Sequence, residues 1–373
     1  MTTKIMHVGE YIKGGVYSYL YDILEYQSNM KDSLIYLVAS SYKSEKKYPL
    51  KKEQVFYYKY KRNPLYMIYA MIYILVLIKK IKPDIIHVHS TFAGLFVRLP
   101  LIFLPKKDIK IIYCSHGWSF LMETSLLAKN IYIKIEKSLA NVTTKIINIS
   151  KYEQVESIKV GMPESKSILI YNGTKKIKNK KNYSFNVRDI EDSKINILFV
   201  GRFDRQKGID ILLDVIRNTT LKNIHLYLIG DSVLSKGDIP FNLPENVTKI
   251  GWVNKEEIDI YYQSIDAVII PSRWEGFGLV AIEAMKNKKA VIASNRGALP
   301  ELIIDGTNGF IFDINNINTL NLILESLDKE TLKTLGENGY KYYNENFTCE
   351  NMNIKILNVY SSILGEKLEM LKV

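Results

Sequence analysis

The sequence predicts an α/β protein of two domains, because short apolar runs alternate with helical segments and this alternation occurs twice along the chain. A chain of 373 residues is also too long for one ordinary hydrophobic core. The stretch 175–194 is polar, as interdomain linkers are. We therefore expect an N-terminal domain over 1–180 and a C-terminal domain over 195–349, both Rossmann-like and facing across a cleft. A last helix, about 350–373, is expected to pack back on the first domain.

The composition is that of a soluble globular protein, with 47% hydrophobic and 24% charged residues. The two cysteines, Cys114 and Cys349, lie far apart and make neither a disulfide framework nor a zinc-site spacing. The N-terminus enters a strand directly near Lys4, without the pattern of a signal peptide. These features favour a protein of the reducing cytoplasm.

The charge is divided unevenly between the two halves. Residues 1–180 contain 29 Lys and Arg against 13 Asp and Glu, whereas residues 181–373 contain 22 against 26. A basic half indicates a polyanion or an anionic membrane as its partner. The alternative is a set of solvated lysine-rich faces. The basic residues alternate with aromatic ones over 42–62, which favours the membrane surface.

An apolar run over 65–78 follows this basic stretch, and Lys79, Lys80 and Lys82 close it. Fourteen residues are fewer than the roughly 20 that a helix needs to span a bilayer. The run is either a buried helix against the sheet or an amphipathic helix at a membrane interface. We expect the helix itself to be buried, with its basic flanks at the membrane surface.

The strongest local pattern of the second half surrounds a glycine turn. The apolar run 267–270 predicts a buried parallel strand. Gly276 and Gly278 then allow a tight turn into a helix expected over about 277–287. Ligands of doubly wound sheets bind beside such turns, and the free N–H groups of the helix start favour an anion.

Two carboxylates, Glu275 and Glu283, bracket this turn with seven residues between them. Glu283 falls about two turns into the helix, so the pair suits hydroxyl recognition at two points of one extended ligand. The alternative is a surface glutamate in a loop and a second glutamate that complements the helix dipole. The spacing by itself leaves both interpretations open.

A second turn carries cations. Strand 195–200 runs into Gly201, and Arg202, Arg205 and Lys207 follow before a helix begins. Two or three cations beside free backbone N–H groups predict a diphosphate site. An exposed basic loop is the alternative. In the first half, Gly14 and Gly15 precede a helix in the same manner, which by itself is a weak signal.

Three histidines of the first half end predicted strands. His87 and His89 stand two apart, so both face one side of their strand. A metal pair is conceivable there, but no third ligand is near in the sequence, and we expect no metal site. His116 comes at the carboxyl end of the strand 110–115 and is followed by glycine, so it points toward a ligand crevice. A histidine with a purely structural role is the alternative.

The Glu275–Glu283 pair with Gly-Phe-Gly after the first glutamate resembles the E-x7-E signature of retaining GT-B glycosyltransferases, and family 4 most closely. Further landmarks follow in family order, including Gly-Arg…Lys-Gly over 201–208. The likeness covers nearly the whole chain and is stronger in the second half. It implies the GT-B fold, in which two Rossmann-like domains face each other.

The resemblance also assigns roles. It implies that Arg202 and Lys207 hold the donor diphosphate, that Glu275 meets the hydroxyls of the donor sugar, and that Glu283 meets the nucleotide ribose. It places His116 at the reacting centre, so the catalytic candidates are His116, Glu275, Arg202 and Lys207. The implied donor-binding residues are Gly14, Gly15, Gly201, Arg202, Lys207, Gly230, Val253, Glu275, Gly276, Phe277, Gly278, Leu279 and Glu283.

The function that follows is a metal-independent retaining transfer of a sugar from a nucleotide sugar, most commonly a UDP-sugar in this family, to a hydroxyl. Cations and helix N–H groups suffice for the leaving diphosphate, and no Asp-x-Asp pair lies in a suitable loop. No cofactor is expected. The basic first half suggests a glycan acceptor linked to polyprenyl diphosphate at the inner membrane face, as in capsule or O-antigen synthesis.

Three alternatives stay open. A nucleotide-sugar 2-epimerase shares the GT-B fold but needs acid and base groups and no acceptor. A nucleic-acid binder is suggested by the net charge of +12, yet no recognised binding module is present and the 26 tyrosines are dispersed, so no nucleic acid is expected. A catalytically silent partner subunit would keep the fold, but the intact Arg202, Lys207, Glu275 and Glu283 argue against it.

Overall fold

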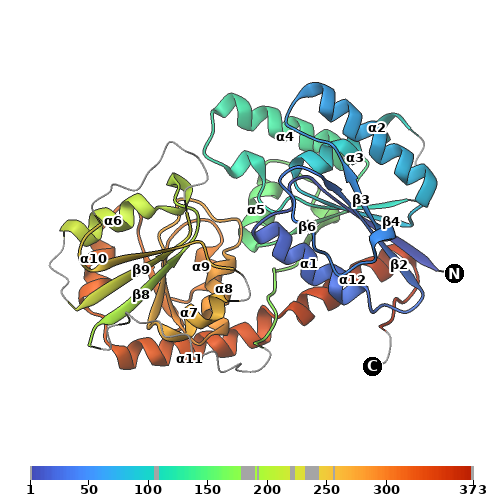
Figure 1. The fold of residues 1–373 in the computed structure, drawn as a ribbon. Coiled ribbons are helices and arrows are strands. Elements are labelled where there is room, and N and C mark those ends of the chain that lie inside the picture. Colours follow the sequence, from blue (N-terminus) through green and yellow to red (C-terminus); the bar gives the residue numbers. More distant parts are fainter. Residues whose placement is uncertain are drawn as a thin grey trace. The chain divides into compact units, whose positions relative to one another are not determined.

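The computed structural model describes residues 2–104, 109–177, 190, 193–218, 223–231, 243–254 and 257–370. The chain forms two compact units, one of Met1–Gly173 with Cys349–Val373 and one of Thr174–Thr348 (Figure 1). Each unit is built on its own parallel sheet, as the sequence predicted for an α/β chain. Most of the stretch expected to be the linker lies outside the described residues.

The first unit contains a seven-stranded sheet in the order β3-β2-β1-β4-β5-β6-β7, with every pair parallel. The strands are β1 (Thr3–Gly9), β2 (Ser33–Ser40), β3 (Val55–Tyr58), β4 (Ile85–His89), β5 (Lys110–Cys114), β6 (Lys145–Asn148) and β7 (Ser167–Leu169). The helices are α1 (Gly15–Gln27), α2 (Pro64–Ile81), α3 (Thr91–Phe103), α4 (Leu126–Ala140), α5 (Lys151–Lys159) and α12 (Cys349–Leu364).

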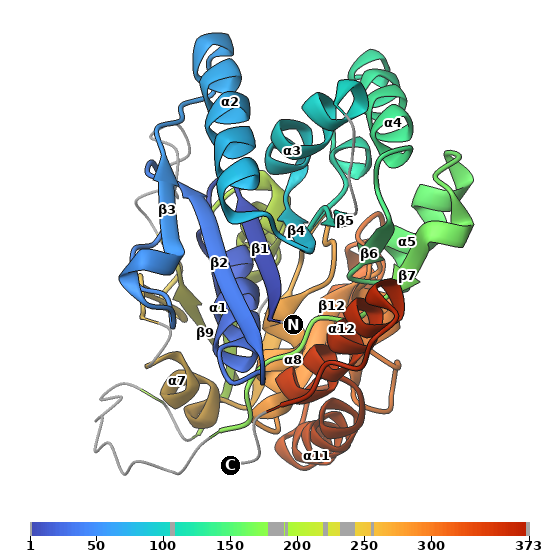
Figure 2. The same ribbon diagram turned by 90° about the vertical axis from the view of Figure 1, so that its right-hand side faces the viewer.

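Alternation along the strands divides this unit into two layers of side chains. Met6, Val8, Ile86 and Val88 join the apolar core with residues of α2 and α3. His7, which lies between two of them on β1, faces the other way and bonds to Gln27 of α1. The views in Figure 1 and Figure 2 show α2, α3 and α4 together on one face of the sheet, with α1 and α12 on the other.

The second unit has a six-stranded parallel sheet in the order β10-β9-β8-β11-β12-β13. Its strands are β8 (Ile195–Val200), β9 (Ile224–Ile229), β10 (Val247–Gly251), β11 (Ala267–Ile270), β12 (Ala290–Ser294) and β13 (Gly309–Phe312). Its helices are α6 (Ile209–Asn218), α7 (Ile258–Ser264), α8 (Leu279–Lys286), α9 (Leu299–Leu302), α10 (Asn318–Glu325) and α11 (Lys329–Asn346).

Two expectations need correction. Helix α8 begins at Leu279 rather than near Phe277, because Gly278 takes a φ of +106° and holds the turn open for one more residue. Helix α2 is buried on one face only. Its inner face, with Ala70 and Ile74, packs into the core, whereas Leu65 is 77% and Ile72 is 57% exposed. An apolar composition all round a helix does not tell which of its faces meets the protein.

Candidate active site

The candidate site of the second unit lies at the point where its strand order reverses. From β8 the chain proceeds outward to β9 and β10, and then returns to add β11 on the other side of β8. The two motif segments, 201–208 and 271–278, directly follow β8 and β11. Ligands of open parallel sheets bind outside the carboxyl ends of such a strand pair. The fold therefore brings the two predicted turns together at the carboxyl edge of one sheet.

Glycines let the backbones of these turns approach closely. Gly208 has a φ of +70°, and a Cβ added there would lie 1.9 Å from the carbonyl oxygen of Pro271. Gly230 has a φ of +133°, and an added Cβ would lie 1.8 Å from the carbonyl oxygen of Gly201. A side chain at either position would push the turn away from its neighbour. Gly201 and Gly230, both expected at the donor, thus also serve local packing.

Lys207 and Glu275, which the sequence placed on different turns, meet in the structure. The Lys207 ammonium forms an ion pair with Oε1 of Glu275. The Ser272 hydroxyl donates a 3.0 Å hydrogen bond to the same oxygen. Both charged side chains are largely enclosed, with 19% and 10% of their surface exposed. The arrangement places an ammonium and a carboxylate side by side, which suits a ligand that carries both phosphate and hydroxyl groups.

Arg202 is held more loosely at the rim of the same turn. Its guanidinium lies 3.2 Å from the Asp204 carboxylate and donates a 2.7 Å hydrogen bond to Gln206. The side chain remains 46% exposed. Asp204 also accepts a 3.1 Å hydrogen bond from the backbone N–H of Lys207, which orders the short 3-10 turn Arg205–Lys207. Arg202 is therefore oriented but still open to an incoming anion.

Glu283 has a partner that the sequence did not reveal. The Tyr262 hydroxyl of α7 donates a 3.0 Å hydrogen bond to Oε2 of Glu283. Tyr262 is fully buried, and burial raises its pKa well above the ordinary value. The hydroxyl is thus a permanent donor that orients one oxygen of the carboxylate. The two residues lie 21 positions apart, and no motif in the chain connects them.

The remaining residues of the turn after β11 contribute backbone rather than side chains. Phe277 is 3% exposed and packs edge-on against Phe347, with ring centroids 6.0 Å apart. Gly276 and Gly278 are also buried, and Leu279 opens helix α8. The structure thus directs the Phe277 ring into the protein interior. On the other side of β8, Val253 follows β10 and is partly exposed.

In the first unit, His116 follows β5 at the carboxyl edge of the sheet. Its backbone takes a φ of +54°, a left-handed conformation that is costly for a residue with a Cβ. Nε2 of His116 lies 3.0 Å from Nδ1 of His89, and the Tyr19 ring packs edge-on at 4.5 Å between centroids. Burial lowers the pKa of His116 to about 3, so the ring is neutral at physiological pH.

The glycines before α1 are exposed. Gly14 has a φ of +59° as the N-cap of the helix, and a Cβ added to it would meet nothing within 4 Å. Gly15 is the first residue of α1. The loop offers free backbone N–H groups, as the sequence indicated.

The histidine pair of β4 has a third histidine beside it. His7 on β1 pairs in register with His87, and one ring nitrogen from each of His7, His87 and His89 lies within 4.8 Å of the others. We expected no third ligand near His87 and His89, and this was wrong: His7 is distant in the sequence but lies beside them in the folded chain. Only the sheet order, which sets β1 against β4, brings His7 there.

The chain matches two family models. Residues 180–342 match the family "Glycosyl transferases group 1", and residues 13–175 match "Glycosyltransferase Family 4". The chain is 36% identical over 337 residues to an uncharacterized 41.2 kDa protein in the cps region of Klebsiella pneumoniae, covering 88% of this chain and 90% of that protein. It is 34% identical over 290 residues to an uncharacterized glycosyltransferase of Methanocaldococcus jannaschii, covering 75% and 76%.

Solved structures share the fold at low identity. A sucrose-phosphate synthase from Thermosynechococcus elongatus superposes with a TM-score of 0.81 at 20% identity, covering 97% of this chain and 99% of that one. HepE from Anabaena, solved with UDP and glucose, has a TM-score of 0.77 at 19% identity and covers 96% and 100%. These likenesses extend over both units and confirm the predicted GT-B fold.

Proposed function

The chain belongs to the family 4 glycosyltransferases, and we propose that it transfers a sugar, with retention at the anomeric carbon, from a nucleoside diphosphate sugar to a hydroxyl. The observation that carries this proposal is the cluster of Lys207, Glu275 and Ser272 at the β8/β11 reversal point. UDP is the proposed nucleotide, since HepE was solved with UDP-glucose.

Lys207 and Arg202 stabilise the diphosphate as it leaves. The bond between the anomeric carbon and the phosphate oxygen breaks, a bond to the acceptor oxygen forms, and the leaving diphosphate takes the acceptor proton. Negative charge grows on the diphosphate in this step, and two cations with the N–H groups at the start of α8 stabilise it. We propose that no metal is needed, because these groups already supply positive charge.

Glu275 and Glu283 recognise hydroxyl groups in this proposal. Ser272 and Lys207 both engage Oε1 of Glu275, so the other carboxylate oxygen is left to accept from the donor sugar. Tyr262 orients Glu283 toward the ribose in the same manner. Glu275 has no assigned role as a covalent nucleophile.

The acceptor is proposed to be a glycan carried on a lipid diphosphate. An Escherichia coli galactosyltransferase that is named for GlcNAc-diphosphoundecaprenol is 24% identical over 317 residues, and an Escherichia coli O-antigen glycosyltransferase is 30% identical over 242. With the Klebsiella relative from a cps region, these names support a role in surface polysaccharide synthesis. The test is transfer from UDP-sugars to lipid-diphosphate GlcNAc, with product stereochemistry read by NMR.

A membrane surface fits the exposed face of three neighbouring helices in the first unit. The exposed apolar residues are Leu65, Ile68, Ile72 and Val76 of α2, Phe103 of α3, and Leu126, Leu127 and Ile131 of α4. Monomeric soluble proteins rarely expose so many large apolar side chains together. The same helices carry Lys79, Lys80 and Lys129, all of them exposed or partly exposed. The patch is both apolar and basic, which is typical of contact with anionic lipid.

Among the described helices of 18 or more residues, α2 is the one that is long and apolar enough to cross a membrane. Its inner face argues against crossing, because Ala70 and Ile74 are fully buried in the core of the unit. We propose that the protein binds peripherally, at the cytoplasmic face of the membrane. Cys114 and Cys349 are both buried and form no disulfide with each other, which is compatible with that compartment.

A further inference from the structure

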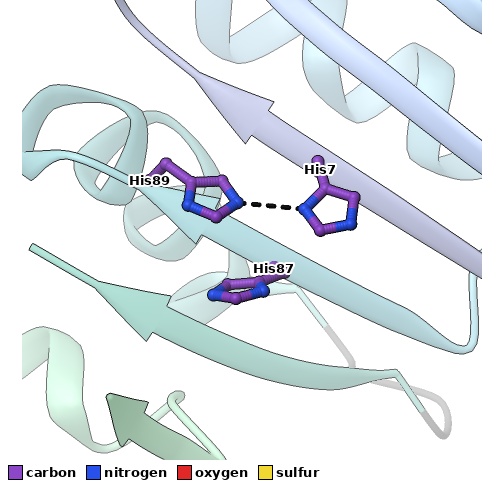
Figure 3. A group of neighbouring side chains, drawn as sticks. All are labelled: His7, His87 and His89. Carbon is purple, nitrogen blue, oxygen red and sulfur yellow. Dashed lines mark hydrogen bonds between the residues drawn. The ribbon is translucent and has the colours of Figure 1, made fainter. Parts of the chain in front are cut away.

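A continuous row of buried side chains joins His116 to the interior of the first unit. From His116, the first contact is the 3.0 Å distance between its Nε2 and Nδ1 of His89. Nε2 of His89 then lies 3.0 Å from Nδ1 of His7, the contact drawn in Figure 3. Nε2 of His7 lies 2.8 Å from Oε1 of Gln27. His7, His89 and Gln27 are at most 1% exposed, so no bulk water competes for these bonds.

The sheet holds this row in place. His7 and His89 lie on adjacent parallel strands, where Gly9 is the register partner of His89 and His87 that of His7. His89 in turn pairs with Cys114, two residues before His116. The row therefore starts at the reversal point of the first sheet, between β1 and β4, and ends in the loop after β5. The left-handed backbone at His116 is the cost of turning its ring back onto His89.

The hydrogen bonds assign a direction to the row. Gln27 Nε2 donates to the Tyr360 hydroxyl at 3.4 Å, so Gln27 Oε1 is the atom that faces His7. An oxygen can only accept, so His7 carries its proton on Nε2 and leaves Nδ1 as an acceptor. His89 then donates from Nε2 and accepts at Nδ1, and His116 donates from Nε2. One amide thus sets the tautomer of three rings.

Burial keeps the row neutral. It lowers the pKa of His7 to about 4 and that of His116 to about 3. The pKa of His89 is also driven well below its ordinary value, chiefly by burial and then by its histidine neighbours. A neutral row has one proton per ring, which is the number the three hydrogen bonds require.

The rings of His7, His87 and His89 are close enough to bind a metal ion together, but their hydrogen bonds argue against a metal site. A zinc ion would need a lone pair from each of His7, His87 and His89 at about 2.0–2.1 Å. The nitrogens of His7 and His89 that approach each other already share a proton at 3.0 Å. His87 accepts a 2.6 Å hydrogen bond at Nδ1 from Tyr360. Its Nε2 is buried and has no hydrogen-bond partner among the described residues, so it carries the remaining proton.

We propose that Gln27, His7 and His89 are positioning residues that hold His116 with its proton on Nε2, so that Nδ1 can accept a hydrogen bond from a substrate hydroxyl. This role rests on the proposed transferase function. Nδ1 of His116 lies 3.7 Å from the Cys114 sulfur, a weak contact that a hydroxyl can replace. A neutral acceptor orients a reacting or neighbouring hydroxyl without placing a second cation beside the sugar.

Substitutions at His89 test the positioning. His89→Leu removes both hydrogen bonds and should lower kcat about tenfold, toward the value of His116→Ala, with little change in the donor KM. His89→Gln should recover part of the loss, because its amide oxygen can accept from His116 while its amide nitrogen donates to His7. His87→Leu is the matched control: it is an equally buried histidine of the same strand whose hydrogen bond goes to Tyr360, outside the row. It should keep kcat near that of the wild type.

Ring nitrogen NMR of the wild-type protein tests the tautomers without any assay of activity. The chain has five histidines, so selective 15N-histidine labelling gives few signals. We expect His7, His89 and His116 to be neutral and protonated at Nε2 from pH 6 to 8. Proton sites on Nδ1, tautomer exchange in His116, or shifts of His7 and His89 on adding Zn²⁺ would each overturn the proposal.

The kinetics of the variants and the NMR measurement together distinguish a failure of this proposal from a failure of the proposed transferase function. If His89→Leu and His87→Leu had equal kcat, positioning by the row would be refuted even with the expected tautomers. If the wild type transferred no sugar, the transferase proposal would fail and with it the role assigned to the row. The NMR result would still decide the hydrogen-bond pattern itself.

Discussion

Both units place their polar groups at the reversal point of a parallel sheet, but they assemble them differently. In the second unit, Lys207 and Glu275 come from two short segments whose glycines and charges are visible in the sequence. In the first unit, Gln27, His7, His89 and His116 come from four separate segments and meet only after the sheet has formed. The comparison teaches that a site made of local turns can be found by motif, whereas a site made across strands needs the strand order.

The largest loss of activity from a single substitution is expected in the second unit. Lys207→Ala removes the more enclosed of the two cations that we propose stabilise the leaving diphosphate, and it should lower kcat/KM by about 10³-fold, the effect of losing one strong transition-state donor. Steady-state kinetics with the donor varied measures it. Lys288→Ala is the matched control, since Lys288 pairs with Glu337 at 3.0 Å on the surface of the same unit. Equal losses in both variants would contradict a local role for Lys207.

The folding stability of the first unit should decrease at acidic pH. His7 has a pKa of about 4 when folded, below the ordinary value of 6.5, so the unfolded chain binds more protons between these values. Its contribution to folding stability is constant above pH 6.5 and falls as pH drops, by about 1.4 kcal/mol per pH unit down to pH 4. His87 and His89 act in the same direction.

Urea unfolding at a series of pH values from 7.5 to 5 measures this loss of stability. In a Trp252→Phe, Trp274→Phe background, the buried Trp118 is the fluorescent reporter of the first unit. His7→Leu should make the pH dependence shallower. A stability of the first unit that does not fall below pH 6.5 would show that these histidines are not held neutral.

Membrane binding should depend on the first unit alone. Leu126→Gln with Leu127→Gln removes two of the most exposed apolar side chains, at 80% and 72%, and should weaken binding to anionic vesicles roughly tenfold. Leu322→Gln, at a 66% exposed leucine of the second unit, is the control and should leave binding unchanged. Vesicle pelleting with and without anionic lipid gives the result. Failure of the wild type to pellet would remove the membrane proposal.

The smallest effect is expected from the orienting tyrosine. Tyr262→Phe leaves Glu283 without its 3.0 Å hydrogen bond but changes no charge. A loss of about 1 kcal/mol predicts a rise in donor KM of about fivefold with kcat nearly unchanged. A fall in kcat without a change in KM would instead connect Tyr262 to the reaction step.

The fold was largely predictable because its signals are local. The run 267–270 is apolar throughout, as a strand covered on both faces must be, and β11 spans those four residues. The exposure of Ile72 was not predictable, because the composition of α2 is apolar on both sides and only packing selects the inner face. Likewise, nothing local connects Tyr262 to Glu283, or His7 to His89, since the register of distant elements decides these contacts.

The most direct test of the donor site is a thermal shift with a panel of nucleoside diphosphates, with and without Mg²⁺, on the wild type and on Glu283→Ala. We expect a rise in Tm for one base that exceeds the rise for the other bases by several degrees, no dependence on Mg²⁺, and a weaker rise in the variant. No rise with any nucleotide, or an equal rise in the variant, would contradict a donor site at the β8/β11 reversal point.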